Sequence, residues 1–573
     1  MKNLGINFLI KNLSVKRKID LGVILILMLI TAFTEIITIG SVIPFVAAII
    51  NPEKIYEIDI LSSFELHKYS SEQLSSYFFF IFILSIIIVT LLNILFIYKN
   101  IKFTKKCGFD IAQIIFKNYL NKDYEKILKS NSSIYLSAII QKTDNVVSVL
   151  YQFLLLVINT LILLFITIVL IVFSPIFTIY LFLFFIFLYF STSFVLKKKL
   201  NEYSKDLSKL LNIRNKILNE TFKNFRQIFL DNSRNIFKEF FSNYDFKFRF
   251  IEARVNFFVH LPRYLYEGIG IVVLSLMAVY LHEKEVFENF DLISYLALLA
   301  ISAQRALPKI NQIYTSWTNI SAMKNIVNDV NTLTYFETEK PDEIDQLEIN
   351  FKESIEFKNI SFSYSKNSEK IFKQFNFKII KGDKFAIKGD SGCGKSTFLD
   401  IFLGLLKQQD GEILIDGKVL EKKHIKSHQN KISSVSQFSM FLDASIKENI
   451  TFNFKKDDIK KEKLELACKT AEIYDFIENL DEKFDTRIGE NGVLLSGGQR
   501  QRIILARALY RDFDLLLLDE ATNALDLKTE SKIIENIINL RKDLTIIYVT
   551  HKSENVKYFD KVFSMENGRL LEI

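Results

Sequence analysis

The sequence holds little cysteine, glycine and proline. Its three cysteines, Cys107, Cys393 and Cys468, are odd in number and lie far apart, which excludes a disulfide framework and the close spacing of a zinc site. Only 18 glycines and 6 prolines stand beside an excess of lysine, isoleucine, phenylalanine and asparagine. We attribute this bias to an AT-rich genome and draw no conclusion about function from it.

The basic character of the chain does not indicate a nucleic-acid partner. The formal net charge is +8, but most of the basic residues lie in loops between apolar runs. That distribution is typical of the cytoplasmic loops of a membrane protein, so we predict that the chain does not bind nucleic acid. A length of 573 residues is too great for one ordinary domain, and two or more are expected.

Apolar stretches dominate the first 320 residues, and six of them have the roughly 20 residues that a membrane-spanning helix needs. The first is too long for the apolar part of a signal peptide and lacks a cleavage site. Ser174 and Pro175 separate the third from the fourth, because proline cannot continue a preceding helix. The sequence predicts a six-span helical domain over residues 1–320, with spans near 21–50, 77–98, 146–173, 176–196, 256–281 and 292–320, and a linker over 321–346.

The loops between these stretches alternate in charge. The N-terminus, residues 99–122 and residues 197–254 are basic, whereas residues 51–76 and 282–291 are mainly acidic. Basic loops stay on the cytoplasmic side, so both termini are predicted to be cytoplasmic. In the first acidic loop Ile58, Leu61 and Phe64 recur every third residue, which fits a short helix on the outer membrane surface or a plain amphipathic loop.

Five ionisable residues fall inside the expected spans: Glu35, Arg263, Glu267, Arg305 and Lys309. Charges within a membrane are costly, and each is therefore a candidate for a functional role. Arg263 and Glu267 are four residues apart and could simply pair with each other on one helix face. We predict contact with a ligand for Arg263 and Arg305.

From residue 347 the pattern changes to short alternating strands, one of which leads into a phosphate-binding loop of the form G-x-x-x-x-G-K-[ST]. Backbone N–H groups of such a loop bind nucleotide phosphates, Lys395 is expected to reach the β- and γ-phosphates, and the Ser396 hydroxyl is expected to bind Mg²⁺. The loop comprises Gly389, Asp390, Ser391, Gly392, Cys393, Gly394, Lys395, Ser396 and Thr397.

Further along, the apolar run Leu515 to Leu518 ends in Asp519 and Glu520. A buried parallel strand that ends in acids is expected to place them where α/β sheets bind ligands. We predict Asp519 as a Mg²⁺ ligand and Glu520 as the general base that polarises the attacking water. His551, after a strand at 544–549, is placed to contact the γ-phosphate. A helix begins at residues suited to an anion, namely Ser496, Gly497, Gly498 and Gln499.

In this order and spacing, these motifs resemble the ATPase domain of ABC transporters over residues 347–573. The resemblance implies an α/β P-loop ATPase that uses ATP and Mg²⁺. It also implies that Tyr364 stacks on adenine, that Gln437 senses Mg²⁺ and the membrane domain, and that residues 486–492 contact membrane loops as in exporters. Asn523 stands in the D-loop where the family usually has serine.

The resemblance also implies that Ser496 and Gly498 bind the ATP held by the phosphate loop of a second subunit. One loop, one signature and six spans are half of the usual complement, so the chain resembles a half-transporter of exporter type. A homodimer is the simplest assembly, and a heterodimer with a related half remains open. The expected location is the bacterial inner membrane, with membrane lipids as surroundings and the ATPase domain in the cytoplasm.

Three segments in the spans, residues 33–45, 261–270 and 305–311, resemble bacterial lipid-linked oligosaccharide flippases. The resemblance implies a polyprenyl-pyrophosphate-linked saccharide as substrate, and arginine binds phosphate oxygens bidentately, so Arg263 and Arg305 are the predicted contacts. Val89 and Gln312 stand where further arginines would be expected. The alternatives are an exporter of lipids, drugs or peptides, and a channel or regulator that does not pump, which an intact Glu520 and His551 argue against.

Overall fold

The computed structural model describes residues 13–50, 70–128, 130–173, 175–283, 289–335, 347–365, 369–390, 392–436, 440–453, 459–552 and 554–573. Inside the helices, some side chains also lie outside the description, among them those of Arg263 and Glu267 and most of those in 172–198 and 281–296. The chain divides into two compact units. One comprises Met1–Lys122 and Ser130–Glu339, and the other comprises Asp123–Lys129 and Lys340–Ile573.

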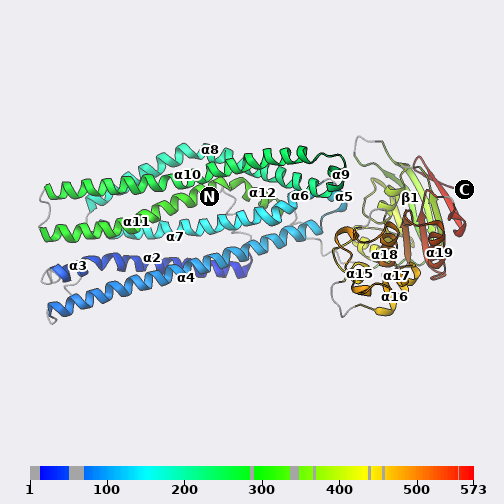
Figure 1. Ribbon diagram of the computed structural model, residues 1–573, viewed down its shortest axis with the longest axis horizontal. Helices are drawn as coiled ribbons and strands as arrows, with labels where there is room; N and C mark the ends of the chain where they lie inside the picture. Colours follow the sequence, from blue (N-terminus) through cyan, green and yellow to red (C-terminus); the bar gives the residue numbers. More distant parts are fainter. Residues whose placement is uncertain are drawn as a thin grey trace. The chain divides into compact units, whose positions relative to one another are not determined.

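The first unit is helical, and its long helices run side by side (Figure 1). The long helices are α2 (Val15–Gly40), α4 (Ser71–Leu120), α7 (Thr143–Phe173), α8 (Pro175–Lys223), α10 (Arg234–Glu283) and α11 (Asn289–Ala322). Shorter helices join or extend them: α3 (Val42–Ile50), α6 (Ser132–Ser137), the π-helix η4 (Ala138–Lys142), α9 (Phe225–Leu230) and α12 (Lys324–Tyr335).

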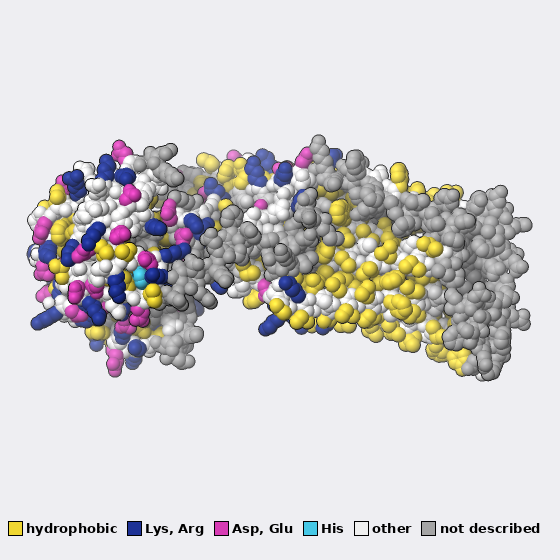
Figure 2. Space-filling view, turned by 180° about the vertical axis from the view of Figure 1, so that it is seen from behind, with side chains coloured by type: hydrophobic (Ala, Val, Ile, Leu, Met, Phe, Trp, Pro, Cys, Tyr) yellow, Lys and Arg dark blue, Asp and Glu magenta, His cyan; other side chains and the backbone are white. Residues whose placement is uncertain are grey.

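Three helical stretches among the described residues are long and apolar enough to cross a membrane: Val15–Val46, Glu72–Leu120 and Ser132–Ile171. They contain or overlap the expected spans at 21–50, 77–98 and 146–173, and the other expected spans fall on α8, α10 and α11. Figure 2 shows hydrophobic side chains covering much of this unit on the face drawn, and charged side chains gathered over the other unit.

The first expected span is broken in two, which the sequence analysis did not predict. α2 ends at Gly40 and α3 begins at Val42, with Pro44 in its first turn. Proline has no N–H to donate to the preceding turn, so the first helix stops before it. The amphipathic segment expected around Ile58, Leu61 and Phe64 lies outside the described residues. The predicted linker 321–346 begins within helical structure, because α12 occupies much of it.

A buried lysine ties three parts of the helical unit together. Lys142, in the π-helix η4, is 1% exposed, and its Nζ lies 2.6 Å from Asp329 Oδ2 on α12. Ser208 of α8 donates to the same carboxylate oxygen at 2.5 Å. An ammonium removed from water needs such a partner, because an unpaired buried charge is strongly destabilising.

The second unit contains two sheets. A six-stranded sheet has the order β10-β9-β3-β8-β7-β6, with β9, β3, β8, β7 and β6 parallel and β10 antiparallel at one edge. Its strands are β3 (Lys384–Lys388), β6 (Ile432–Val435), β7 (Leu515–Asp519), β8 (Thr545–Val549), β9 (Lys561–Glu566) and β10 (Arg569–Glu572). An antiparallel sheet consists of β1 (Ser354–Phe362), β2 (Phe372–Ile380), β4 (Asp410–Ile415) and β5 (Lys418–Val419).

Helices cover the parallel sheet. β7 and β8 are buried along nearly all their length, as expected of parallel strands packed on both faces. The α-helices of this unit are α5 (Tyr124–Leu128), α13 (Lys395–Phe402), α14 (Ile425–Asn430), α15 (Ile446–Thr451), α16 (Lys461–Thr470), α17 (Tyr474–Glu478), α18 (Gly497–Tyr510) and α19 (Leu527–Ile538). Single 3₁₀ turns are η5 (Lys422–His424), η7 (Lys483–Asp485), η8 (Glu490–Gly492) and η9 (Val556–Tyr558).

The ion pair between the buried Lys142 and the partly exposed Asp329 yields a first prediction. Asp329→Asn removes the charge that balances Lys142, and we expect it to destabilise the protein by about 1–3 kcal/mol. The matched control is Asp144→Asn, which removes the same charge from an exposed pair with Lys105 at 3.3 Å. That variant is expected to change stability by less than about 1 kcal/mol. Thermal unfolding in detergent compares the two, and equal shifts would show that Lys142 does not depend on Asp329.

Candidate functional site

The phosphate loop connects β3 to α13 at the carboxyl end of the parallel strands. Gly392 adopts a φ of +86°, and Gly394, which precedes the first turn of α13, adopts +109°. Such left-handed conformations favour glycine, so these two positions fix the path of the loop. The N–H groups at the start of α13 have no partner within the helix and are available to an anion. Ser391 lies outside the described residues.

Lys395 is the first residue of α13. Its side chain is buried, and its Nζ donates to the carbonyl oxygens of Gly389 at 2.6 Å and Asp390 at 2.9 Å. At Gly389 an added Cβ would lie 2.6 Å from the Met565 carbonyl oxygen, so a larger residue would force the loop off β9. The ammonium is therefore held within the loop, and its contact with the β- and γ-phosphates stays a prediction.

Tyr364 lies beside the start of α13. Its hydroxyl is 3.1 Å from Thr397 Oγ1, and its ring packs edge-on against Phe362 with centroids 5.2 Å apart. Part of the ring stays exposed. An exposed aromatic face next to the phosphate loop suits a nucleotide base, and stacking on adenine remains a prediction.

Asp519 ends β7, and Glu520 follows it. Burial raises the pKa of Asp519 to about 6, and the neighbouring carboxylates of Glu520 and Asp400 add to the rise. A nearby cation would favour the ionised form of such a partly buried carboxylate. The hydroxyl of Ser396 and the carboxylate of Asp519 are oxygen donors of the kind that Mg²⁺ prefers, so the residues fit this ion. Gln437, the third predicted ligand, lies outside the described residues.

Glu520 is held on both sides. Its Oε1 lies 2.8 Å from His551 Nε2, and its Oε2 accepts a hydrogen bond from Asn523 Nδ2 at 2.8 Å. The backbone at Glu520 has a φ of +50°, and its N–H donates to the Val549 carbonyl of β8. The side chain is 12% exposed. The carboxylate is thus fixed at the strand end while water can still reach it.

Asn523 contributes more than the sequence analysis assigned to it. The sequence identified it as a departure from serine in the D-loop, without a partner. In the structure it donates directly to Glu520, an interaction that the shorter serine side chain would not make from the same position. The D-loop is therefore linked to the predicted base.

A second feature was missed altogether: a buried carboxylate beneath the site. Glu530 of α19 is fully buried and accepts hydrogen bonds from Thr522 Oγ1 at 2.7 Å, Tyr548 OH at 2.9 Å and Lys552 Nζ at 2.9 Å. Burial raises the pKa of Tyr548 to about 12, which keeps the phenol a donor. The network joins the segment after Glu520 to the segment after His551.

The sequence does carry a signal for Glu530. It precedes Ile533, Ile534 and Ile537 at spacings of three, four and seven, so it lies on the apolar stripe of α19. A carboxylate at such a position is buried and needs partners.

The signature residues begin α18. Ser496 caps the helix through a capping box with Gln499. A Cβ added to Gly498 would lie 3.4 Å from the carbonyl oxygen of Ala524, and Ala524 N–H donates to Gln501 Oε1 at 2.7 Å. The start of this helix and the D-loop therefore pack closely, which glycine at Gly497 and Gly498 allows.

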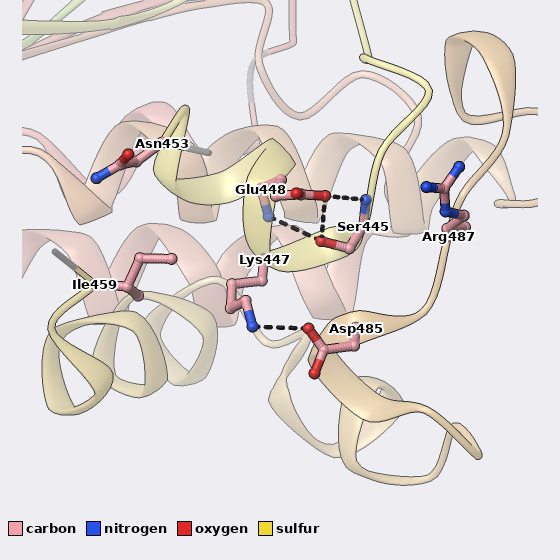
Figure 3. A pocket seen from close by; sticks show the side chains of 7 residues that line it. All are labelled: Ser445, Lys447, Glu448, Asn453, Ile459, Asp485 and Arg487. Atoms are coloured by element: carbon pink, nitrogen blue, oxygen red, sulfur yellow. Dashed lines mark hydrogen bonds and ion pairs between the residues drawn. The ribbon is translucent and has the colours of Figure 1, made fainter. Parts of the chain in front are cut away.

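A separate cavity of about 160 Å³ lies in the same unit (Figure 3). The Lys447 ammonium pairs with Asp485 at 2.7 Å across it, and Ser445 and Glu448 hydrogen-bond at the start of α15. Arg487, from the segment 486–492, borders it, and contact of that segment with membrane loops stays a prediction. The lining residues are Ser445, Lys447, Glu448, Asn453, Ile459, Asp485 and Arg487.

The predicted substrate contacts lie in the helical unit. Arg305, on α11, has its Nη1 3.6 Å from Glu35 Oε2 on α2. The sequence indicated both residues as candidates for a functional role, but not that they pair with each other. Arg263 and Glu267 are on α10, and their side chains lie outside the described residues.

Comparison with known proteins identifies the class. The family described as "ABC transporter" matches residues 372–523, and the family described as "ABC transporter transmembrane region" matches residues 12–258. The chain therefore belongs to the ABC transporters, with a transmembrane region fused ahead of the ATPase domain. This confirms the predicted fold class, a helical transmembrane domain followed by an α/β P-loop ATPase domain.

Two known proteins are each similar to part of this chain. The chain is 39% identical over 222 residues to the ATP-dependent lipid A-core flippase of Desulfotalea psychrophila, covering 39% of this chain and 38% of the flippase. It is 39% identical over 219 residues to the ABC multidrug transporter atrD of Emericella nidulans, covering 38% of this chain and 16% of atrD. The chain thus spans less than two thirds of these relatives.

A solved structure shares the fold. It is described as a bacterial Atm1-family ABC exporter with ATP bound, and the match covers 97% of this chain and 94% of that chain with a TM-score of 0.77. At 19% sequence identity this likeness concerns the fold alone.

The loop cysteine yields a second prediction. Cys393 is partly exposed, whereas Cys107 and Cys468 are buried, and burial raises the pKa of the Cys468 thiol to about 12. A maleimide reagent is expected to label Cys393 first, to inhibit ATP hydrolysis in proportion, and to be slowed by MgATP. Mass spectrometry of the labelled chain locates the adduct. Cys393→Ser should keep its own hydrolysis rate in the reagent, and inhibition of that variant would contradict this placement.

Asn523 yields a third prediction. Asn523→Ala removes one hydrogen bond to Glu520 and is expected to lower kcat for ATP hydrolysis about three- to tenfold, with KM little changed. Asn523→Asp has the same shape but sets a second negative charge against Glu520, so a larger loss of about 30-fold is expected. Asn539→Ala, at the exposed end of α19, is the control. Equal rates for the Ala and Asp variants would rule out this contact.

Proposed function

We propose that the chain hydrolyses ATP and couples the hydrolysis to export across the bacterial inner membrane, with both termini and the ATPase domain in the cytoplasm. The observation that carries this proposal is the position of Glu520, directly after Asp519 at the end of β7 and 2.8 Å from His551. A carboxylate fixed there can accept a proton from water. Regulation or gating without turnover would not need that arrangement.

Each residue of the site has a distinct task in this proposal. The N–H groups of the phosphate loop and Lys395 bind the phosphate oxygens of ATP, and Tyr364 supports the base. Ser396 and Asp519, with Gln437, would hold Mg²⁺, which supplies positive charge against the phosphates when bound. Glu520 orients the attacking water and takes its proton, while His551 and Asn523 fix the direction of the carboxylate.

The proposed assembly is a homodimer, or a heterodimer with a related half. Gly497 and Gly498 add no side chains at the start of α18, and a helix N-terminus attracts an anionic phosphate. Ser496 and Gly498 would contact the ATP bound by the phosphate loop of the second subunit. ATP binding would close two ATPase domains on each other, and hydrolysis would release them.

The proposed substrate is a polyprenyl-pyrophosphate-linked oligosaccharide, moved from the inner to the outer leaflet. Its support is the resemblance of residues 33–45, 261–270 and 305–311 to lipid-linked oligosaccharide flippases, together with cations among apolar helices. Arg305, and Arg263 by its position on α10, would bind the pyrophosphate. The similarity to a lipid A-core flippase supports an amphipathic lipid substrate more broadly.

The second candidate is export of other lipids, drugs or peptides. The similarity to a multidrug transporter favours it. It differs in its consequence for Arg305, because hydrophobic drugs, many of them cationic, do not need an arginine partner.

Inverted membrane vesicles that carry a short-chain polyprenyl-pyrophosphate oligosaccharide test the proposal. ATP is expected to remove the saccharide from the exposed leaflet, as measured by its loss of access to a glycosidase added outside. Glu520→Gln keeps the shape of the side chain but cannot accept the proton, so ATP hydrolysis should fall about 100-fold or more and movement should stop.

Two outcomes would count against this function. Movement that continues in Glu520→Gln would separate transport from hydrolysis at this site. Brisk hydrolysis in the unmodified protein with no movement of the saccharide would exclude this substrate and favour the exporter of other lipids or drugs, which the same vesicles can test with those compounds.

A further inference from the structure

A row of polar side chains is buried along α2. Thr31, Glu35 and Thr38 recur at spacings of four and three, and each is at most 1% exposed. The two threonines donate to carbonyl oxygens of their own helix, Leu27 and Thr34, at 2.8 and 3.2 Å. Among the described residues no group donates a hydrogen bond to either carboxylate oxygen of Glu35. The hydroxyls of both threonines are hydrogen-bonded, whereas the Glu35 carboxylate accepts no hydrogen bond from the described residues.

A second polar row runs along α11. Ser302, Arg305, Lys309, Gln312 and Ser316 follow one another at spacings of three and four, and so share one face of the helix. The C-terminal part of the row is hydrogen-bonded, since Gln312 donates to Ser316 and Ser316 donates to Gln152 of α7. The N-terminal part holds two cations one turn apart, Arg305 and Lys309, and both interact electrostatically with Glu35.

The contact between the two rows is loose. Arg305 Nη1 and Glu35 Oε2 are 3.6 Å apart, beyond the 2.7–2.9 Å of a charge-assisted hydrogen bond. The two partners also differ in exposure, with 29% for Arg305 and 1% for Glu35. The guanidinium of Arg305 is therefore the more accessible partner, and its N–H groups are the donors that a ligand can reach. Two cations and one anion leave a net charge of +1 among these three residues.

We propose that Glu35 is a built-in counter-anion for the cation pair Arg305–Lys309, and that the phosphate group of an amphipathic substrate takes over Arg305 from it. This inference rests on the proposed function, and it assigns a role to a residue that the substrate itself need not touch. Before a substrate binds, Glu35 balances charges that would be costly among apolar helices.

The exchange follows from geometry and charge. A phosphate can bind a guanidinium bidentately, which the carboxylate at 3.6 Å does not do. At the same time the fixed negative charge of Glu35 opposes the incoming anion and keeps its affinity moderate. A moderate affinity suits a transported substrate, which must leave the site again. A neutral amphiphile of the same chain length gains nothing from Arg305.

Binding can be measured directly on the full chain in phosphatidylcholine nanodiscs. The single tryptophan, Trp317, lies on α11 about two turns beyond Lys309 and serves as the fluorescent reporter. The probes are geranylgeranyl pyrophosphate, its neutral alcohol geranylgeraniol, and inorganic pyrophosphate. Glu35→Gln removes the competing charge, so half-saturation by the pyrophosphate lipid is expected at a concentration lower by about tenfold. Arg305→Gln is expected to raise it by about tenfold or more.

The controls separate charge from shape. Thr38→Val, isosteric and buried on the same face of α2, should leave half-saturation unchanged. Glu35→Asp, which keeps the charge but draws it back from Arg305, should tighten binding to a smaller extent and serves if the Gln variant does not fold. Unchanged or weaker binding by the Glu35 variants would overturn the proposal, as would absence of binding by the pyrophosphate lipid. Equal binding of inorganic pyrophosphate would refute the requirement for an amphipathic ligand.

The outcome is independent of the vesicle experiment. Tighter binding by Glu35→Gln, without any ATP-driven movement of the saccharide, would support the counter-anion role of Glu35 and refute the transport proposal. ATP-driven movement with a Glu35→Gln variant that binds as the unmodified protein does would refute the counter-anion alone.

Discussion

The role proposed for Glu520 depends on a carboxylate that its neighbours hold in one direction. Four buried leucines of β7 carry it to the carboxyl edge of the sheet, its own N–H bonds to β8, and His551 and Asn523 contact one oxygen each. Beneath it, the buried Glu530 binds Thr522 and Lys552, and so fixes the two segments that supply those contacts. Each interaction is modest alone, but they share one rigid frame, and a preorganised carboxylate does not need to reorient during the reaction.

The same physical problem, a charge removed from water, is solved differently in the helical unit. Lys142 has a close partner in Asp329, at hydrogen-bond distance and supported by Ser208. Glu35 has only a distant one in Arg305, at 3.6 Å and without a hydrogen bond. A tight pair stabilises one arrangement of helices, whereas a loose pair can exchange partners. The contrast supports a structural role for Lys142 and a ligand-dependent role for Glu35. Such a division fits the proposed transport, in which the helices stay assembled while Arg305 binds and releases a charged substrate.

The sequence predicted the ATPase half in detail, because its motifs are local: Lys395, Asp519, Glu520 and His551 each follow a strand whose pattern is visible in the chain. The fold class and the order of strand, loop and helix around the phosphate loop were predicted correctly, whereas the roles of the site residues stay predictions. What it did not predict depends on contacts between distant segments. The link from Asn523 to Glu520 requires the actual turn, and the Glu530 network joins three segments. The pairing of Glu35 with Arg305 spans most of the helical unit, whereas the alternative of a local pair, Arg263 with Glu267, was available from spacing alone. The break after Gly40 was foreseeable from Pro44, but an unbroken apolar run concealed it.

The most direct test of the whole account asks whether each ATP site is built from two copies of the chain. Lys395→Ala disables the phosphate loop of one copy, and Ser496→Arg blocks the start of α18 in the other. Two affinity tags isolate the dimer that contains one copy of each variant, and its ATP hydrolysis is then measured beside the two single-variant dimers. If each ATP site is shared by two copies, the mixed dimer hydrolyses ATP, because one of its two sites combines an intact loop with an intact α18. Each single-variant dimer is then inactive. A mixed dimer as inactive as the single variants would show that loop and signature act within one chain, and would contradict the account.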